Sequence, residues 1–218
     1  MHHELEVFDN EEALARGAAA FIVERAQHAV AQRGRFCFAV SGGHSPWRTF
    51  EELTRRPMPW EETEIYQVDE RVAPLGDGER NLTHLEESLT HVAAHIVPMP
   101  VEARDLDVAA DDYAALLPER FDLVHLGLGP DGHTASLVPD DAVLELEDRL
   151  VGVTGVYNGC VRMTLTYRAL ARADQILWLV VGPGSREALG RLLAGDEVIT
   201  AGRVTAPHSL VMTTEPRD

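Results

Sequence analysis

The chain has 218 residues, of which 36 are Asp or Glu and 19 are Lys or Arg, so its formal net charge is −17. All 19 of these cations are arginines. Without lysine the chain is neither a pyridoxal phosphate enzyme, nor a class I aldolase, nor an ordinary P-loop nucleotide hydrolase. A charge this negative also argues against a general binder of nucleic acid or anionic membranes, although a local cluster of arginines still permits one anionic ligand.

The sequence shows no sign of a membrane segment, a secretory signal or a metal site. No apolar run approaches the roughly 20 residues of a membrane helix, and the start of the chain is acidic and polar. Cys37 and Cys160 are too few for a disulfide framework or a zinc ligand set, and no other ligand spacing stands out. We therefore expect a cytoplasmic, metal-free protein with a single domain over residues 1–218, present as a monomer or small homo-oligomer.

Short apolar runs alternate with stretches of helical periodicity along the chain. The pattern predicts helices over residues 9–34, 47–55, 81–92, 111–117 and 186–193. It predicts strands over residues 35–40, 63–68, 96–99, 121–128, 161–166, 175–181 and 209–213, with a short helix between the strands 161–166 and 175–181. This alternation is typical of an α/β fold, with a mostly parallel sheet flanked by helices on both faces in a Rossmann-like, three-layer arrangement.

Four polar or glycine-rich segments directly follow predicted strands. They are SGGHSP at 41–46, DER at 69–71, GPDGHTAS at 129–136 and GPGS at 182–185. In parallel α/β sheets, ligands bind beyond the carboxyl ends of the strands. The sequence therefore predicts a ligand site at that edge of the sheet.

The first of these segments joins a strand to a helix through Gly42 and Gly43. Backbone N–H groups in such a turn, with the helix N-terminus behind them, suit a phosphate or a carboxylate. The hydroxyl of Ser45 either caps the helix or contacts the anion. A plain strand-to-helix turn needs glycine equally, so both interpretations stay open.

Arg71 and His133 are the side chains that most directly suggest chemistry. A guanidinium can hold an anion at two oxygens, but Arg71 could equally form an ion pair with Asp69 or Glu70. Histidine serves well as a general base near neutral pH, and the alternative for His133 is an exposed side chain in a helix-capping loop. The chain has no Gly-x-Ser-x-Gly elbow, which makes serine nucleophile chemistry less attractive.

Six segments together resemble the 6-phosphogluconolactonases, within the wider group that includes glucosamine-6-phosphate deaminases. In the family's order they are AVSGGHSP (39–46), VDERVAP (68–74), RN (80–81), GLGPDGHTASLVPD (127–140), RMTLT (162–166) and VVGPGSREAL (180–189). GPDGHTAS is the most specific of them. Deaminases typically carry a glutamate in a Phe-Asn-Glu-Pro context where this chain has Ser-Leu-Val-Pro at 136–139, so the resemblance favours the lactonase branch.

The resemblance implies a cofactor-free hydrolase that opens 6-phospho-D-glucono-1,5-lactone to 6-phosphogluconate in the oxidative pentose phosphate pathway. By the same resemblance His133 would be the general base that activates water, and Asp131 would orient it or bind sugar hydroxyls. The residues expected to bind the phosphate or the rest of the substrate are Gly42, Gly43, His44, Ser45, Arg71, Asn81, Arg162 and Arg186.

The chain also departs from the family's pattern. His44 replaces a small hydroxyl residue, Arg80 replaces a serine, and residues 158–161 replace a proline-rich stretch. Ser185 stands where the family has a lysine thought to contact the phosphate, so Arg186 or His44 would have to take its place. Two alternatives therefore stay open, an amino-sugar phosphate deaminase or isomerase and a sugar-phosphate-binding paralogue without turnover.

Overall fold

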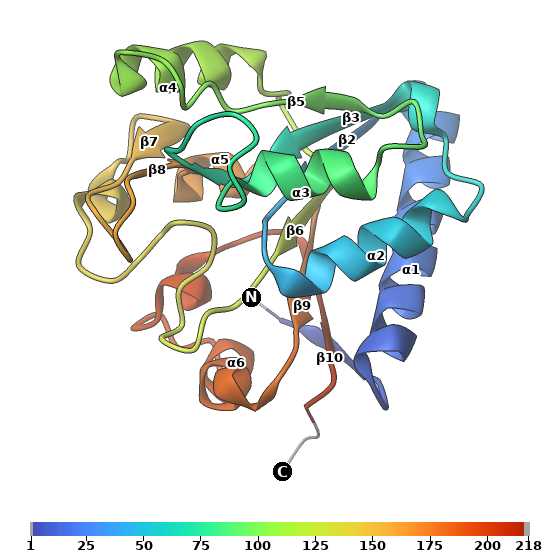
Figure 1. The fold of residues 1–218 in the computed structure, drawn as a ribbon. Coiled ribbons are helices and arrows are strands. Elements are labelled where there is room, and N and C mark those ends of the chain that lie inside the picture. Colours follow the sequence, from blue (N-terminus) through green and yellow to red (C-terminus); the bar gives the residue numbers. More distant parts are fainter. Residues whose placement is uncertain (1, 216–218) are drawn as a thin grey trace.

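A computed structural model describes residues 2–215, with the exception of the side chains of His44 and Ser45. Within these residues a seven-stranded sheet lies between two layers of helices (Figure 1). All of its strand pairs are parallel. In spatial order the strands are β1 (Glu4–Val7), β10 (His208–Thr213), β9 (Gln175–Val180), β6 (Leu123–Leu126), β2 (Phe36–Val40), β3 (Thr63–Gln67) and β5 (His95–Val97). The predicted three-layer α/β fold is thereby confirmed.

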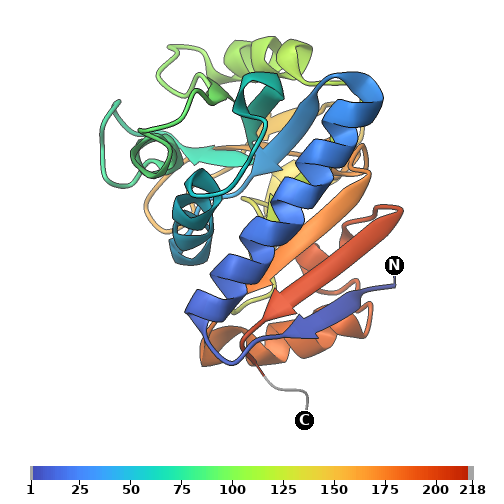
Figure 2. The same ribbon diagram turned by 90° about the vertical axis from the view of Figure 1, so that its right-hand side faces the viewer.

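Each face of the sheet packs against its own group of helices. The helices on one face are α1 (Glu11–Arg33), α2 (His44–Thr54) and α3 (Asn81–Ser88), and Figure 2 shows α1 crossing the strands. The helices on the other face are α4 (Leu106–Leu116), α5 (Tyr167–Leu170) and α6 (Arg186–Leu193). Because successive side chains of a strand point to opposite faces, Phe36 and Phe38 contribute to the first core, and Cys37 and Ala39 to the second. Burial on both faces explains why β2 is a continuous apolar run.

The helix α1 begins and ends where its caps place it. The side chain of Asn10 accepts a hydrogen bond from the N–H of Ala13 at 2.9 Å, so the N-cap lies one residue after the predicted start at Asp9. Gly34 ends the helix in the left-handed conformation with φ 73°, and its N–H returns to the carbonyl of Val30.

Three further differences from the prediction have local causes. The edge strand β1 was not predicted because it has only four residues and is mostly exposed, although its glutamates alternate with apolar residues as in a strand. The segment 161–166 is indeed a strand, but β8 (Arg162–Leu165) pairs antiparallel with β4 (Asp69–Arg71) and β7 (Val151–Val153) in a second, three-stranded sheet. The helix α4 starts at Leu106 rather than at 111, because Asp105 caps it by accepting from two backbone N–H groups at 3.1 Å.

None of the helices in the described part of the chain is both long enough and apolar enough to cross a membrane.

Candidate active site

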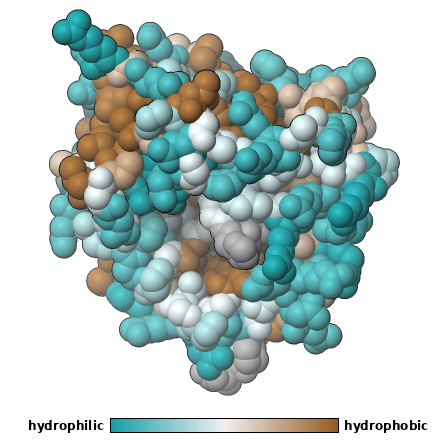
Figure 3. Space-filling model, in the orientation of Figure 1, coloured by the Kyte–Doolittle hydropathy of each residue, from teal (hydrophilic) through white to brown (hydrophobic). Residues whose placement is uncertain are grey.

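A cavity of about 260 Å³ opens beyond the carboxyl ends of β2 and β6. In the sheet, β3 and β5 lie on one side of β2, whereas β6 and β9 lie on its other side. The direction in which successive strands are added therefore reverses between β2 and β6. Such switch points form the ligand crevices of open α/β sheets. In the view of Figure 3 the surface is hollowed near the middle of the face.

The cavity gathers most of the residues that the sequence predicts for the site. Those that line it are Gly42, Gly43, Arg71, Asn81, His133 and Arg162. The side chains of His44 and Ser45 lie outside the described residues. Arg186 is not part of the lining, because its guanidinium pairs with the carboxylate of Glu215 at 2.8 Å. Ser185, at the position of the expected lysine, donates to the carbonyl of Leu128 at 3.0 Å.

His133 lines the cavity and pairs with Asp131, which lies behind it and is not part of the lining. Nδ1 of His133 lies 2.5 Å from Oδ1 of Asp131, and the backbone N–H of His133 donates to the same oxygen at 3.1 Å. Burial raises the pKa of Asp131, but the hydrogen bonds from His133 outweigh it and hold the pKa below its ordinary value. In the tautomer that donates from Nδ1, the Nε2 atom of His133 keeps its lone pair and is able to accept a proton.

The loop that carries this pair folds back on itself. The N–H of Gly129 donates to the carbonyl of His133 at 2.8 Å, and the N–H of Gly132, whose φ is +84°, donates to the carbonyl of Gly129 at 3.0 Å. A Cβ atom on Gly129 would overlap the imidazole of His133. Glycine at this position is therefore what allows the ring to lie against the loop.

Arg71 and Arg162 bring two positive charges to the cavity. Arg71 donates to the backbone carbonyl of Glu79 at 2.5 Å, and Arg162 to the hydroxyl of Ser136 at 3.5 Å. Among the residues that the structure describes, neither arginine forms an ion pair. The ion pair left open for Arg71 is thus not formed, and Glu70 pairs instead with Arg80 at 3.4 Å.

Several cavity residues carry buried polar atoms that have no hydrogen-bond partner within the described part of the chain. These atoms are Oγ of Ser41, Nε of Arg71, Nε2 of His125 and Nε of Arg162. Burial lowers the pKa of His125 to about 3, and its Nδ1 accepts from the N–H of Ser41 at 3.3 Å. Buried polar groups normally have hydrogen-bond partners. The Nε atoms of both arginines carry a proton and donate, and Nε2 of His125 also donates when Nδ1 acts as the acceptor. The arrangement favours a ligand rich in acceptor oxygens.

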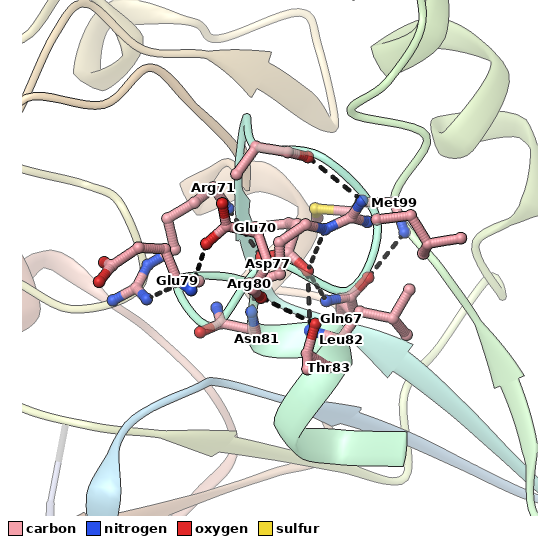
Figure 4. Close-up of polar contacts among 12 residues, drawn as sticks. Gln67, Glu70, Arg71, Asp77, Glu79, Arg80, Asn81, Leu82, Thr83 and Met99 are labelled. Atoms are coloured by element: carbon pink, nitrogen blue, oxygen red, sulfur yellow. Dashed lines mark hydrogen bonds and ion pairs between the residues drawn. The ribbon is translucent and has the colours of Figure 1, made fainter. Parts of the chain in front are cut away.

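Glu70 holds one wall of the cavity together, as the dashed lines of Figure 4 show. Its carboxylate is fully buried and accepts four hydrogen bonds of 2.8 Å each. The donors are the backbone N–H groups of Arg71, Asn81 and Leu82 and the side-chain amide of Gln67. Because two of these groups belong to the first residues of α3, Glu70 fixes the start of that helix beside Arg71.

The sequence did not single out Tyr157 or Asp69 as site residues. Tyr157 donates from its hydroxyl to Oδ2 of Asp131 at 3.2 Å. Asp69 is buried in the cavity lining, where burial raises its pKa, and it accepts from the hydroxyl of Ser136 at 2.6 Å. A signal for Tyr157 exists in the Asn158-Gly159 dipeptide that follows it, since Asn-Gly is typical of tight hairpin turns.

Comparison with known proteins places these motifs in one family. The model of the family described as glucosamine-6-phosphate isomerases/6-phosphogluconolactonase matches residues 9–217. A 6-phosphogluconolactonase of Synechocystis is 34% identical over 90% of this chain and 87% of its own length. One from Mesorhizobium japonicum is 36% identical over 86% of this chain and 84% of its own length.

Solved structures agree with this assignment. A 6-phosphogluconolactonase from Shewanella baltica superposes with a TM-score of 0.89 at 27% identity, over 97% of both chains. A monomeric glucosamine-6-phosphate deaminase has a TM-score of 0.84 at 16% identity, over 96% of this chain and 97% of its own, a likeness of fold alone. The chain therefore belongs to the glucosamine-6-phosphate isomerase/6-phosphogluconolactonase family.

Proposed function

We propose that this chain hydrolyses 6-phospho-D-glucono-1,5-lactone to 6-phosphogluconate. The observation that carries the proposal is the His133–Asp131 pair, because His133 lines the same cavity as two arginines that form no ion pair among the described residues. A base next to a positively charged wall suits an ester-like bond in a phosphorylated substrate. The relatives that match most of the chain are named 6-phosphogluconolactonases, which supports the same reaction.

In the proposed mechanism His133 acts first as a base and then as an acid. Its Nε2 takes a proton from a water molecule while the water oxygen bonds to the lactone carbonyl carbon, giving a tetrahedral oxyanion. When this intermediate collapses, the bond to the ring oxygen breaks and that oxygen takes the proton back from the imidazolium. Asp131 stabilises the imidazolium through Nδ1 and keeps the ring in the productive tautomer.

The phosphate group of the substrate is assigned to Arg71 and Arg162, with backbone N–H groups of the Gly42-Gly43 turn. Two guanidinium groups near the start of α2 offer the charge and the hydrogen-bond donors that a phosphate prefers. The role that the family gives to a lysine falls to this pair, because Arg186 is held by Glu215. The binding energy of the phosphate then positions the carbonyl beside His133.

Hydrolysis of freshly generated 6-phosphogluconolactone tests the proposal, with the His133→Ala variant assayed alongside. The wild type should accelerate hydrolysis, and His133→Ala should lower kcat by roughly 100- to 10,000-fold. Ammonia release from glucosamine 6-phosphate would instead support a deaminase. Binding of 6-phosphogluconate without any turnover would support a non-catalytic paralogue. The cytoplasmic location and the monomeric or small oligomeric state remain predictions from the sequence.

A further inference from the structure

Tyr157 lies between the two halves of the proposed site. Its hydroxyl donates to Oδ2 of Asp131 at 3.2 Å, and its ring meets the imidazole of His133 edge-on, with 5.6 Å between centroids. The guanidinium carbon of Arg162 lies over the face of the same ring, 5.2 Å from its centroid. One side chain therefore touches both members of the base pair and one of the two cavity arginines.

A tight turn sets the position of Tyr157. The N–H of Tyr157 donates to the carbonyl of Cys160 at 3.0 Å, and the N–H of Cys160 returns to the carbonyl of Tyr157 at 3.2 Å. Asn158 and Gly159 between them have φ of 50° and 78°, as a type I′ hairpin requires.

The hydroxyl of Tyr157 completes the hydrogen bonding of Asp131. Oδ1 of Asp131 already accepts from the ring and the backbone N–H of His133, so the hydroxyl supplies the contact at the second oxygen. A carboxylate held at both oxygens does not rotate without losing a hydrogen bond. Burial and the nearby charge of Asp131 raise the pKa of Tyr157, which keeps its hydroxyl protonated and able to donate.

We propose that Tyr157 is a positioning residue with two separable parts. Its hydroxyl holds Asp131 in the orientation that keeps the proton of His133 on Nδ1, and its ring holds the guanidinium of Arg162 at the cavity wall. The inference rests on the proposed lactonase function for the assignment of His133 and Arg162 to catalysis and binding. The geometry of the three contacts does not depend on the substrate.

Two substitutions separate the two parts. Tyr157→Phe removes only the hydroxyl, so kcat should fall about 10-fold, the effect of losing a hydrogen bond to a charged group, while KM stays within about twofold. Tyr157→Ala also removes the ring, so KM should additionally rise about 3- to 10-fold. Loss of fold alone would not give this split, because it would lower the active fraction of both variants without changing KM.

A measurement without substrate keeps the inference separate from the proposed function. In ¹⁵N NMR spectra of the neutral imidazole, His133 of the wild type should be mainly the Nδ1–H tautomer, and Tyr157→Phe should increase the Nε2–H share. If the wild type does not accelerate lactone hydrolysis, the proposed function fails, and the tautomer measurement still decides whether Tyr157 orients the pair.

Tyr167→Phe provides the matched control. The hydroxyl of Tyr167 donates to the carbonyl of Thr200 at 2.9 Å, and the guanidinium carbon of Arg203 lies 4.7 Å from its ring centroid, so it has the same kinds of contact outside the cavity lining. This variant should keep kcat, KM and the tautomer of His133. Wild-type kcat and an unchanged His133 tautomer in Tyr157→Phe would overturn the role of the hydroxyl, and an unchanged KM in Tyr157→Ala would overturn that of the ring.

Discussion

Arg71 and Arg162 lie directly opposite each other in the antiparallel pair formed by β4 and β8. Side chains at opposed positions project from the same face of a sheet, and both arginines line the cavity. Like charges in this arrangement destabilise a sheet, and a chain with 36 acidic residues has many groups that could neutralise them. Neither arginine forms an ion pair among the described residues. Both lower the pKa of Asp69 in the same lining, but burial of that carboxyl has the larger effect and raises it. The two guanidinium groups therefore bring positive charge to the place where an anion is proposed to bind.

Replacing one of these arginines should weaken substrate binding without weakening the fold. For Arg162→Met we expect KM to rise about 10- to 100-fold, because a charged hydrogen-bond donor to the phosphate is lost. The midpoint of thermal unfolding should change little, because relief of the repulsion with Arg71 offsets the lost contacts of Arg162 with Tyr157 and Ser136. Steady-state kinetics and thermal denaturation measure the two effects.

Inorganic phosphate gives an independent measure of the same pair. It should raise the unfolding temperature of the wild type and of Arg168→Met, whose exposed guanidinium donates only to the carbonyl of Glu147 among the described residues. It should have little effect on Arg162→Met. Equal protection of all three proteins would show that the phosphate binds elsewhere.

Gly129 should be indispensable for the position of His133. The φ of Gly129 is not in the left-handed region, so alanine there meets no backbone strain. What remains is the overlap of its Cβ with the imidazole of His133 and with Oδ1 of Asp131. We expect Gly129→Ala to lower kcat about 100-fold, the usual effect of misplacing a catalytic group by about 1 Å. Gly190→Ala in α6 is the control, because a Cβ there meets no atom within 4 Å. Similar kcat values for both variants would contradict the prediction.

The sequence was sufficient for the elements whose burial shows in their composition. β2 and β9 are apolar on both faces, and their patterns located them correctly. A strand pattern does not encode the direction of pairing, which is why the antiparallel placement of β8 was not foreseen. The short strand β1 pairs only with β10 among the described residues, and its four residues alone do not reveal this long-range contact.

The same distinction holds for the site. His133 and Arg71 follow strands, and the rule that ligands bind at strand ends was enough to select them. Tyr157 reaches Asp131 across 26 positions of sequence, and Glu215 removes Arg186 from the cavity across 29 positions. Contacts of this kind depend on the tertiary packing, so the identity of a residue and its sequence neighbours does not reveal them.

The charge of Asp131 should matter for catalysis and for stability at low pH. Asp131→Asn removes the acceptor that selects the Nδ1–H tautomer, so kcat should fall by roughly 100- to 10,000-fold. Because the pKa of Asp131 is lowered in the folded state, its stabilisation is complete above the unfolded pKa, about 3.9, and is lost as the pH falls through the folded value. In urea unfolding, the advantage of the wild type over Asp131→Asn should therefore shrink below about pH 4. A constant difference between pH 7 and pH 3 would contradict this assignment.

Glu70 should be required both for stability and for the shape of the cavity wall. In Glu70→Gln the amide has one acceptor oxygen where the carboxylate had two, so donors among Arg71, Asn81 and Leu82 lose partners. The buried guanidinium of Arg80 also loses its buried counter-charge and keeps only its ion pair with the exposed carboxylate of Glu102. Breaking a buried pair in this way costs about 3 to 5 kcal/mol of unfolding free energy, measurable with urea, and KM should rise as Arg71 loses its support.

Two further variants show whether the charge of Glu70 causes this loss. Glu79→Gln changes an exposed carboxylate in the same segment, of which Arg71 uses only the backbone carbonyl, so its stability and KM should match the wild type. Combining Glu70→Gln with Arg80→Met removes the buried charge that Glu70 no longer balances, and the double variant should recover part of the lost stability. If Glu70→Gln were as stable as Glu79→Gln, the buried carboxylate would not be what fixes β4 against the start of α3.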